Sequence, residues 1–333
     1  MRLNTPRAAL LGTIAISALA LAGCSTGTPA TDSTGLSVVA STNVYGSIAE
    51  SIGGDLVTVT SLITSAAQDP HSFEASAQDQ LAISKADLVV ENGGGYDPFV
   101  DTLLKASSSG APVVNASEAS GLLEADHDHD AADSSTPSTS PDTDDGTESD
   151  DDHAGHDHVE GFNEHVWYSF HGVEHVAEAI AEQLSALDAD NASTYQANLD
   201  AFTAQLETLE ASAEALHAST EGKGVAITEP VPLYLLEAAG FTNRTPEAFS
   251  EAIEEGTDVA PAALAKTLDL FDSGSVALLA YNSQTASSET EQVRTAAEAN
   301  DVPVVEFTET MPDGADYVSW MTDNVSAISA AVK

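Results

Sequence analysis

Short apolar runs alternate with helical patterns along most of this chain. Strands are predicted where β-branched and other apolar residues cluster, at 36–40, 57–63, 86–90, 112–114, 224–227, 276–280 and 302–307. Helical periodicity occupies much of the intervening sequence, at 47–52, 78–85, 96–105, 172–187, from 261 onward, 289–299 and 317–332. This alternation is typical of parallel sheets with helices on both faces. We therefore expect an α/β fold.

One longer helical pattern divides the strands into two sets. Residues 191–219 place Phe202, Leu206, Leu209 and Leu216 along one stripe, with acidic residues on the other face and no Gly or Pro inside. This pattern predicts one long, rigid α-helix (189–220) that joins an N-terminal lobe (36–188) to a C-terminal lobe (221–333). Because ligands of α/β sheets bind at the carboxyl ends of strands, the cleft between the lobes is the expected binding site.

The first residues have the features of an export signal. Arg2 and Arg7 precede an apolar stretch at 8–22 that is too short to span a bilayer as a helix. The sequence Leu21-Ala-Gly-Cys24 then resembles a bacterial lipobox, and Cys24 is the only cysteine of the chain. We expect a lipoprotein signal peptide (1–23), lipidation of Cys24 and a flexible tether (24–35). An ordinary cleaved signal with a chance cysteine is the alternative.

The charge of the chain restricts its partners. The formal net charge is -45, from 54 acidic and 9 basic residues. Removal of residues 1–23 takes away two arginines and no acid, which leaves 54 acids against 7 bases, or -47. Such a chain repels nucleic-acid phosphates and attracts cations. We therefore expect no nucleic-acid partner.

An acidic, histidine-rich tract (124–160) interrupts the first half of the chain. It alternates imidazoles with carboxylates and contains five of the ten histidines, namely His127, His129, His153, His156 and His158. Neutral imidazole is a good ligand for zinc, copper and nickel, so this composition predicts a secondary metal-binding loop. The alternative interpretation is an acidic surface loop whose histidines have no such role.

Four other polar groups follow predicted strands or the tract. His71 lies in Asp69-Pro-His71 after the second strand, and His165 lies in Asn163-Glu-His165 after the tract. Glu229 and Glu309 each follow a strand of the second half. All four positions lie where strands or loops are expected to face the cleft.

At this point the chain resembles the zinc/manganese substrate-binding lipoproteins of bacterial ABC importers, in cluster A-I. The resemblance extends from about residue 36 to 333 and is carried by several motifs in order: Ser41–Gly46, Asp69–Glu74, Asn92–Tyr96, Glu164–Trp167 and Tyr281–Thr285. It implies two lobes bridged by a rigid helix, with one metal ion bound between them by four side chains. It also implies a monomeric, extracytoplasmic receptor that is lipid-anchored to the cell membrane and delivers its ion to an ABC permease.

The resemblance further implies a ligand set. His71 and His165 match the two N-lobe histidines of the family, Glu229 matches the third ligand position, and Glu309 matches the last, where the family usually has Asp. The third position is often His in zinc members and Glu in manganese members, whereas a His-rich loop is typical of zinc members. We expect Zn²⁺, because the Irving–Williams order favours it at N/O sites; Mn²⁺ is the alternative. Metal affinity is then expected to fall below about pH 6.5, as histidines become protonated.

Two other functions are weighed against the receptor. An exported zinc hydrolase would need an open coordination position and a general base, and the sequence has no His-Glu-x-x-His or Gly-x-Ser-x-Gly motif; no enzymatic activity is expected. A zinc-buffering surface adhesin stays a second alternative. Asn43 and Tyr45 follow the first strand and are expected to orient His71 from outside the ligand set.

Overall fold

The computed structural model describes residues 35–123, 159 and 161–332. The described residues belong to one compact unit. The predicted signal peptide, the lipidation site Cys24, residues 24–34 of the tether and the five tract histidines lie outside the described residues.

The N-terminal lobe contains a four-stranded parallel sheet in the order β2-β1-β3-β4. Its strands are β1 (Leu36–Thr42), β2 (Val57–Ile63), β3 (Leu88–Glu91) and β4 (Val113–Asn115). Its helices are α1 (Asn43–Gly53), η1 (Gly54–Leu56), α2 (Ala77–Ile83), α3 (Pro98–Ser107), α4 (Ala116–Ala119), η3 (Val166–Tyr168) and α6 (Phe170–Leu187). Val38, Val39 and Ala40 of the central strand are fully buried, because helices cover both faces of the parallel sheet.

The C-terminal lobe repeats this architecture with a second parallel sheet in the order β6-β5-β7-β8. Its strands are β5 (Gly224–Ile227), β6 (Thr242–Asn243), β7 (Leu279–Asn282) and β8 (Val304–Phe307). Its helices are α9 (Leu233–Ala238), α10 (Glu247–Glu254), α11 (Pro261–Asp272), α12 (Ser288–Ala299) and α13 (Tyr317–Ala331). The predicted fold class is therefore confirmed.

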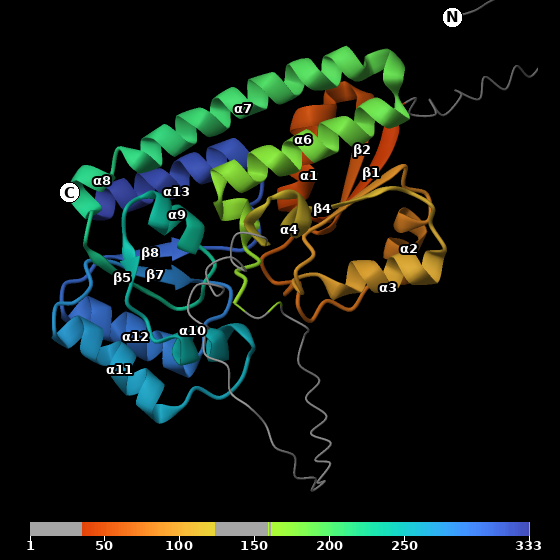
Figure 1. Cartoon of the computed structure of the whole chain (residues 1–333). Helices are drawn as coiled ribbons and strands as arrows, with labels where there is room; N and C mark the ends of the chain where they lie inside the picture. Colours follow the sequence, from red (N-terminus) through yellow and green to blue (C-terminus); the bar gives the residue numbers. More distant parts are fainter. Residues whose placement is uncertain (1–34, 124–158, 160, 333) are drawn as a thin grey trace, which may run out of the picture. The chain divides into compact units, whose positions relative to one another are not determined.

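A long helix joins the lobes, as predicted. It consists of α7 (Ala192–Glu214), preceded by η4 (Ala189–Asn191) and followed by α8 (His217–Thr220). Its buried residues recur every three or four positions, from Tyr195 to Ala213, so one face packs against α1, α6 and α13 (Figure 1). One continuous apolar core contains residues of both sheets and of α7. Sliding one lobe past the other would therefore disturb close packing.

Hydrogen bonds also cross directly from lobe to lobe. The hydroxyl of Tyr317, at the start of α13, donates to the carbonyl of Trp167 at 2.7 Å. The hydroxyl of Tyr168 donates to the carbonyl of Thr308 at 2.7 Å, just after β8. Both phenol rings are buried, so these bonds are shielded from water.

Two short elements of the C-terminal lobe were not predicted. β6 has two residues and α9 has six, which is too short for a reliable apolar period. α10 begins at Glu247, with Pro246 as its N-cap. Within 35–123, 159 and 161–332, no helix has the length and apolar character needed to cross a bilayer.

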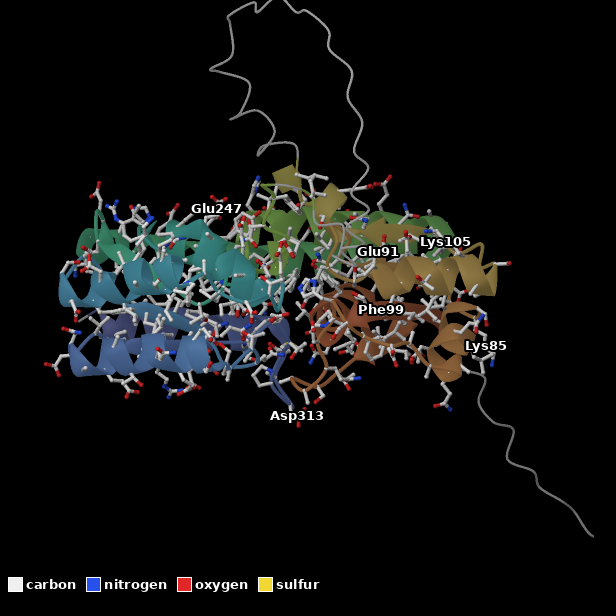
Figure 2. The ribbon with its side chains drawn as sticks, turned by 90° about the horizontal axis from the view of Figure 1, so that it is seen from below. Lys85, Glu91, Phe99, Lys105, Glu247 and Asp313 are labelled. Atoms are coloured by element: carbon white, nitrogen blue, oxygen red, sulfur yellow. The ribbon has the colours of Figure 1, made fainter. Side chains whose placement is uncertain are left out.

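Lys85 and Lys105 project from the surface of the N-terminal lobe (Figure 2).

Candidate metal centre

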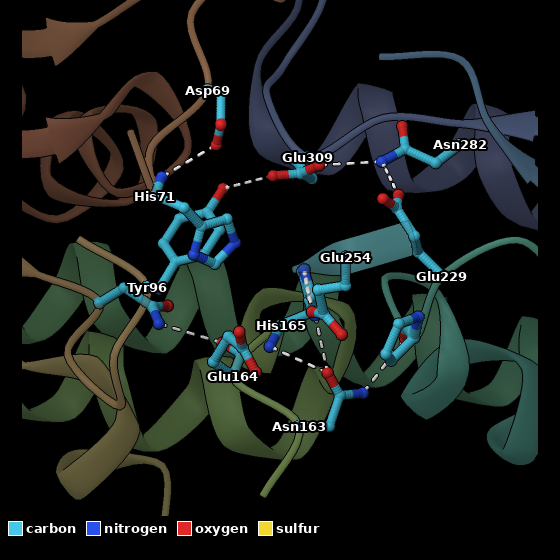
Figure 3. Close-up of polar contacts among 12 residues, drawn as sticks. Asp69, His71, Tyr96, Asn163, Glu164, His165, Glu229, Glu254, Asn282 and Glu309 are labelled. Carbon is cyan, nitrogen blue, oxygen red and sulfur yellow. Dashed lines mark hydrogen bonds and ion pairs between the residues drawn. The ribbon is translucent and has the colours of Figure 1, made fainter. Parts of the chain in front are cut away.

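Imidazoles and carboxylates from both lobes surround one region of the cleft (Figure 3). The N-terminal lobe contributes His71, Glu164 and His165, and the C-terminal lobe contributes Glu229, Glu254 and Glu309. His165, Glu164, Glu229 and Glu309 are 1 to 6 % exposed. Burial of this many ionisable groups is costly unless protons or cations compensate their charge.

The carboxyl ends of three neighbouring strands form the C-lobe half of the site. Glu229 lies two residues after β5, Asn282 ends β7, and Glu309 lies two residues after β8. Since β5, β7 and β8 are adjacent in the sheet, these ends lie together. The side-chain amide of Asn282 donates to Oε2 of Glu229 and, at 2.8 Å, to Oε1 of Glu309. One amide therefore holds both carboxyl groups.

The two carboxyl groups are poor acids in this metal-free arrangement. Burial raises the pKa of Glu229 to about 7. Burial, together with the nearby charge of Glu229, raises the pKa of Glu309 to about 8. Each group therefore retains a proton at a pH where an exposed glutamate is fully ionised. A divalent cation would displace these protons, because it stabilises the ionised form.

Asn163 fixes the orientation and the tautomer of His165. Its side-chain amide nitrogen donates to the carbonyl of Pro230 at 3.2 Å, so its Oδ1 faces the ring. This oxygen lies 2.7 Å from Nδ1 of His165 and accepts its proton. The opposite nitrogen, Nε2, then carries the lone pair, as a metal ligand requires.

His71 lies on the loop between β2 and α2. Its backbone N–H donates to Oδ1 of Asp69 at 2.9 Å, and its ring packs edge-on against Tyr96 with centroids 4.9 Å apart. The hydroxyl of Tyr96 in turn donates to Oε2 of Glu309 at 3.3 Å. Tyr96 therefore connects the His71 side of the cleft with the C-terminal lobe.

Two acidic residues of the centre were not assigned from the sequence. His71, Glu164 and Glu254 each offer a ligand atom, and these atoms lie within 4.8 Å of one another. Oε1 of Glu254 is also 3.7 Å from Nε2 of His165. Burial raises the pKa of Glu254, and the charge of Glu164 adds to this effect. Glu254 ends an amphipathic helix next to other acids, and no sequence signal separates it from a solvent-exposed helix face.

The predicted ligands lie on both sides of the cleft but do not form the tightest group. Within the described part of the chain, three side chains place their possible ligand atoms within 4.8 Å of one another, namely His71, Glu164 and Glu254. Glu229 and Glu309 instead share the amide of Asn282. The assignment of His71, His165, Glu229 and Glu309 as ligands of one ion stays a prediction.

Asn43 and Tyr45 form hydrogen bonds near the centre, and their role in orienting His71 stays a prediction. The side-chain amide of Asn43 exchanges two hydrogen bonds with the backbone of Met311. The hydroxyl of Tyr45 donates to Oδ1 of Asn92, whose amide donates to the carbonyl of Glu164 at 3.1 Å. Both residues lie on α1, which runs close to the backbone of Met311 and to the side chain of Asn92. Asn43 therefore links the lobes, and Tyr45 supports the segment that carries His165.

Similar proteins are known. The manganese-binding lipoprotein MntA of Halalkalibacterium halodurans is 29 % identical over 191 residues, which cover 56 % of this chain and 52 % of that protein. The chain thus spans about half the length of the curated relatives it matches.

Two solved structures share the fold. The periplasmic zinc binding protein TroA from Treponema pallidum aligns with a TM-score of 0.68 and 18 % identity, over 90 % of this chain and 99 % of that one. The SBP FpvC from Pseudomonas aeruginosa, in complex with Mn²⁺, aligns with a TM-score of 0.67 and 24 % identity, over 90 % and 98 %.

The sequence pattern of one family covers nearly all of the two-lobed unit. This family is described as ZnuA, zinc-uptake complex component A, periplasmic, and its pattern matches residues 38–331. Given that match, the chain belongs to the ZnuA family.

Proposed function

We propose that this protein is the extracytoplasmic receptor of an ABC importer and captures a divalent transition metal, Zn²⁺, between its lobes. The ligands would be His71, His165, Glu229 and Glu309, and the loaded protein would deliver the ion to a permease in the cytoplasmic membrane. The observation that carries the proposal is the meeting of two imidazoles with buried carboxyl groups from two lobes at the carboxyl ends of parallel strands.

Four protein ligands suit a cargo site rather than a catalytic one. Two neutral imidazoles and two carboxylates balance the charge of one divalent ion, and zinc accepts such N/O ligands at about 2.0–2.2 Å in tetrahedral geometry. A sphere closed by protein ligands leaves no position for a reacting water, which a hydrolase would require.

Zinc is the first choice of cargo. The Irving–Williams order places zinc above manganese at N/O sites. The tract at 124–160 adds five histidines, which are good zinc ligands and poor manganese ligands. The names of similar proteins are divided, since they include both a manganese-binding lipoprotein and a zinc binding protein.

Manganese is the second candidate, and one observation favours it. Glu164 and Glu254 add two carboxyl groups beside His71. A set of donors dominated by oxygen suits manganese, which accepts more ligands than tetrahedral zinc.

The proposal includes attachment to the membrane. The lipobox-like sequence before Cys24 and the Ser/Thr/Gly-rich residues after it suit a lipidated N-terminus with a flexible tether up to residue 35. The lobes, which we place at 36–188 and 221–333 with the connector helix at 189–220, would then act as a monomer close to the permease.

Competition titrations of metal-free protein with Zn²⁺ and Mn²⁺ test the proposal. One tightly bound ion per chain is expected, and H71A and E309Q should each weaken it strongly. The same stoichiometry should remain after deletion of residues 126–158. Loss of tight binding on that deletion, with several weak ions bound by the intact chain, would instead identify a zinc buffer or adhesin.

A further inference from the structure

A pocket of about 500 Å³ adjoins the candidate centre. Five glutamates line it and neither Lys nor Arg does; they are Glu164, Glu247, Glu251, Glu254 and Glu255. Four of them belong to α10 or follow it directly, whereas Glu164 belongs to the N-terminal lobe. Carboxylates concentrated in a concave surface raise the local concentration of cations.

The pocket and the centre meet at two side chains. Glu164 and Glu254 line the pocket and also belong to the group with His71 whose ligand atoms lie within 4.8 Å. The other three pocket glutamates, on the outer turns of the same helical segment, are exposed. A cation in the pocket would therefore reach the imidazoles by way of Glu164 and Glu254.

Glu254 is a largely but not fully buried residue of this pocket. Its side chain is 12 % exposed, and its Oε1 accepts no hydrogen bond within the described residues. That oxygen lies 3.7 Å from Nε2 of His165, which is too long for a hydrogen bond but suits two atoms bound to one ion. An oxygen buried without a donor is unfavourable, and a bound cation would remove this cost.

The distances agree with a shared ion. Ligand atoms about 2.0–2.2 Å from one tetrahedral ion are about 3.3–3.6 Å apart. The ligand atoms of His71, Glu164 and Glu254 lie within 4.8 Å of one another, so they would need to approach by at most about 1.5 Å. Small side-chain rotations supply such a shift.

We propose that Glu254 is a further ligand of the cargo ion, and that Glu164 and Glu254 bring the ion from the acidic pocket to His71 and His165. This inference rests on the proposed receptor function and deepens it. Glu254 would join the two imidazoles and two carboxylates proposed above as a fifth ligand. Three of the five ligands are then carboxylates. Glu254 then sets the metal preference, because the added carboxylate stabilises six-coordinate Mn²⁺ more than tetrahedral Zn²⁺.

The matched variants E254Q, E251Q and E255Q separate coordination from a general effect of charge. Each removes one carboxylate from the lining of the pocket, but Glu251 and Glu255 do not belong to the His71 group. Affinities of the mature, full-length protein for Mn²⁺ and Zn²⁺ are measured by competition with a chelating dye. We expect E254Q to weaken Mn²⁺ binding about tenfold more than Zn²⁺ binding, which corresponds to about 1.4 kcal/mol. In E251Q and E255Q the ratio of the two affinities should change by less than about threefold.

The visible spectrum of bound Co²⁺ gives a second readout. Loss of a ligand moves cobalt toward four-coordination, so its absorption should be more intense in E254Q than in the wild type, E251Q or E255Q. A thermal melt of each metal-free variant controls for folding. If E254Q does not fold, E254D keeps the charge on a shorter side chain and is expected to shift the affinity ratio in the same direction.

The outcomes separate this inference from the receptor function. If H71A and E309Q lose tight binding while E254Q and E254D leave the affinity ratio and the cobalt spectrum unchanged, Glu254 is no ligand and the receptor function stands. If all pocket variants change the ratio equally, only the charge of the pocket matters and the inference is overturned. If H71A and E309Q retain tight binding, the proposed receptor site itself is wrong.

Discussion

The side chain of Asn43 and the backbone of Met311 form a reciprocal pair across the two lobes. Nδ2 of Asn43 donates to the Met311 carbonyl at 2.9 Å, and the Met311 N–H donates to Oδ1 at 3.1 Å. Asn43 begins α1, and Met311 lies two residues after Glu309. The position of the Glu309 carboxyl group is therefore coupled to the N-terminal lobe.

Replacement of Asn43 by alanine should weaken both the fold and the metal site. Loss of the pair leaves two backbone groups of Met311 without these partners, and we expect the free energy of unfolding to fall by about 1–3 kcal/mol. Metal affinity should fall as well, because the segment that carries Glu309 becomes less restrained. Urea denaturation and metal competition measure the two effects. Unchanged affinity in a destabilised N43A would show that the pair has a structural role alone.

Asn163 should control the ability of His165 to bind metal. N163A removes the acceptor at 2.7 Å from Nδ1, so the ring is free to rotate and to place its proton on Nε2. Loss of such a supporting group typically costs 10–100-fold in metal affinity, and we expect a decrease in that range. N163D keeps the acceptor for Nδ1 but loses the donor to Pro230, so its affinity should lie between those of N163A and the wild type. Equal affinities for N163A and N163D would contradict this role, and nitrogen NMR of the imidazole reports the tautomer directly.

Metal affinity should begin to fall at a higher pH than the histidines alone predict. With the pKa of Glu229 at about 7 and that of Glu309 at about 8, the metal-free site holds protons that the ion must displace. Affinity should therefore decrease as the pH falls from about 8 to 7, before imidazole protonation contributes near about 6.5. Calorimetry in buffers of different ionisation enthalpy measures the protons released. At pH 7 the wild type should release more protons than E309Q; equal release would exclude a proton on Glu309.

The same carboxyl group makes the stability of the metal-free protein depend on pH. Glu309 has a folded-state pKa of about 8, well above the usual 4.5. The folded state therefore binds more protons than the unfolded state, and the stabilising contribution is complete below about 4.5 and is lost as the pH rises through about 8. E309Q removes this dependence. The melting temperature of metal-free E309Q, relative to the wild type, should rise between pH 5 and pH 8.5; a constant difference would contradict the raised pKa.

Much of the fold follows from local patterns. The runs at 57–63 and 224–227 match β2 and β5 to the residue. β5 is continuously apolar and buried, whereas β2, at the edge of its sheet, alternates apolar and polar residues, and both patterns are typical of strands. The connector was recognisable because one stripe of α7 is apolar over several turns. β6 and α9 were missed because elements of two and six residues carry too few positions to show a period.

The sequence by itself determined which residue types stand at strand ends, and the resemblance of its motifs indicated His71, His165, Glu229 and Glu309 as candidate ligands. Only the tertiary structure decided which of these side chains meet. It joined Glu229 to Glu309 through Asn282 and set Asn163 on Nδ1 of His165. It also brought Glu254, which on its own helix resembles its exposed neighbours, to within 4.8 Å of His71 and Glu164. The physical reason is that local periodicity specifies only which face of a helix or strand is buried. The residue that a side chain meets across a cleft depends on how distant segments pack. His71 and Glu254, for example, are more than 150 residues apart in the chain.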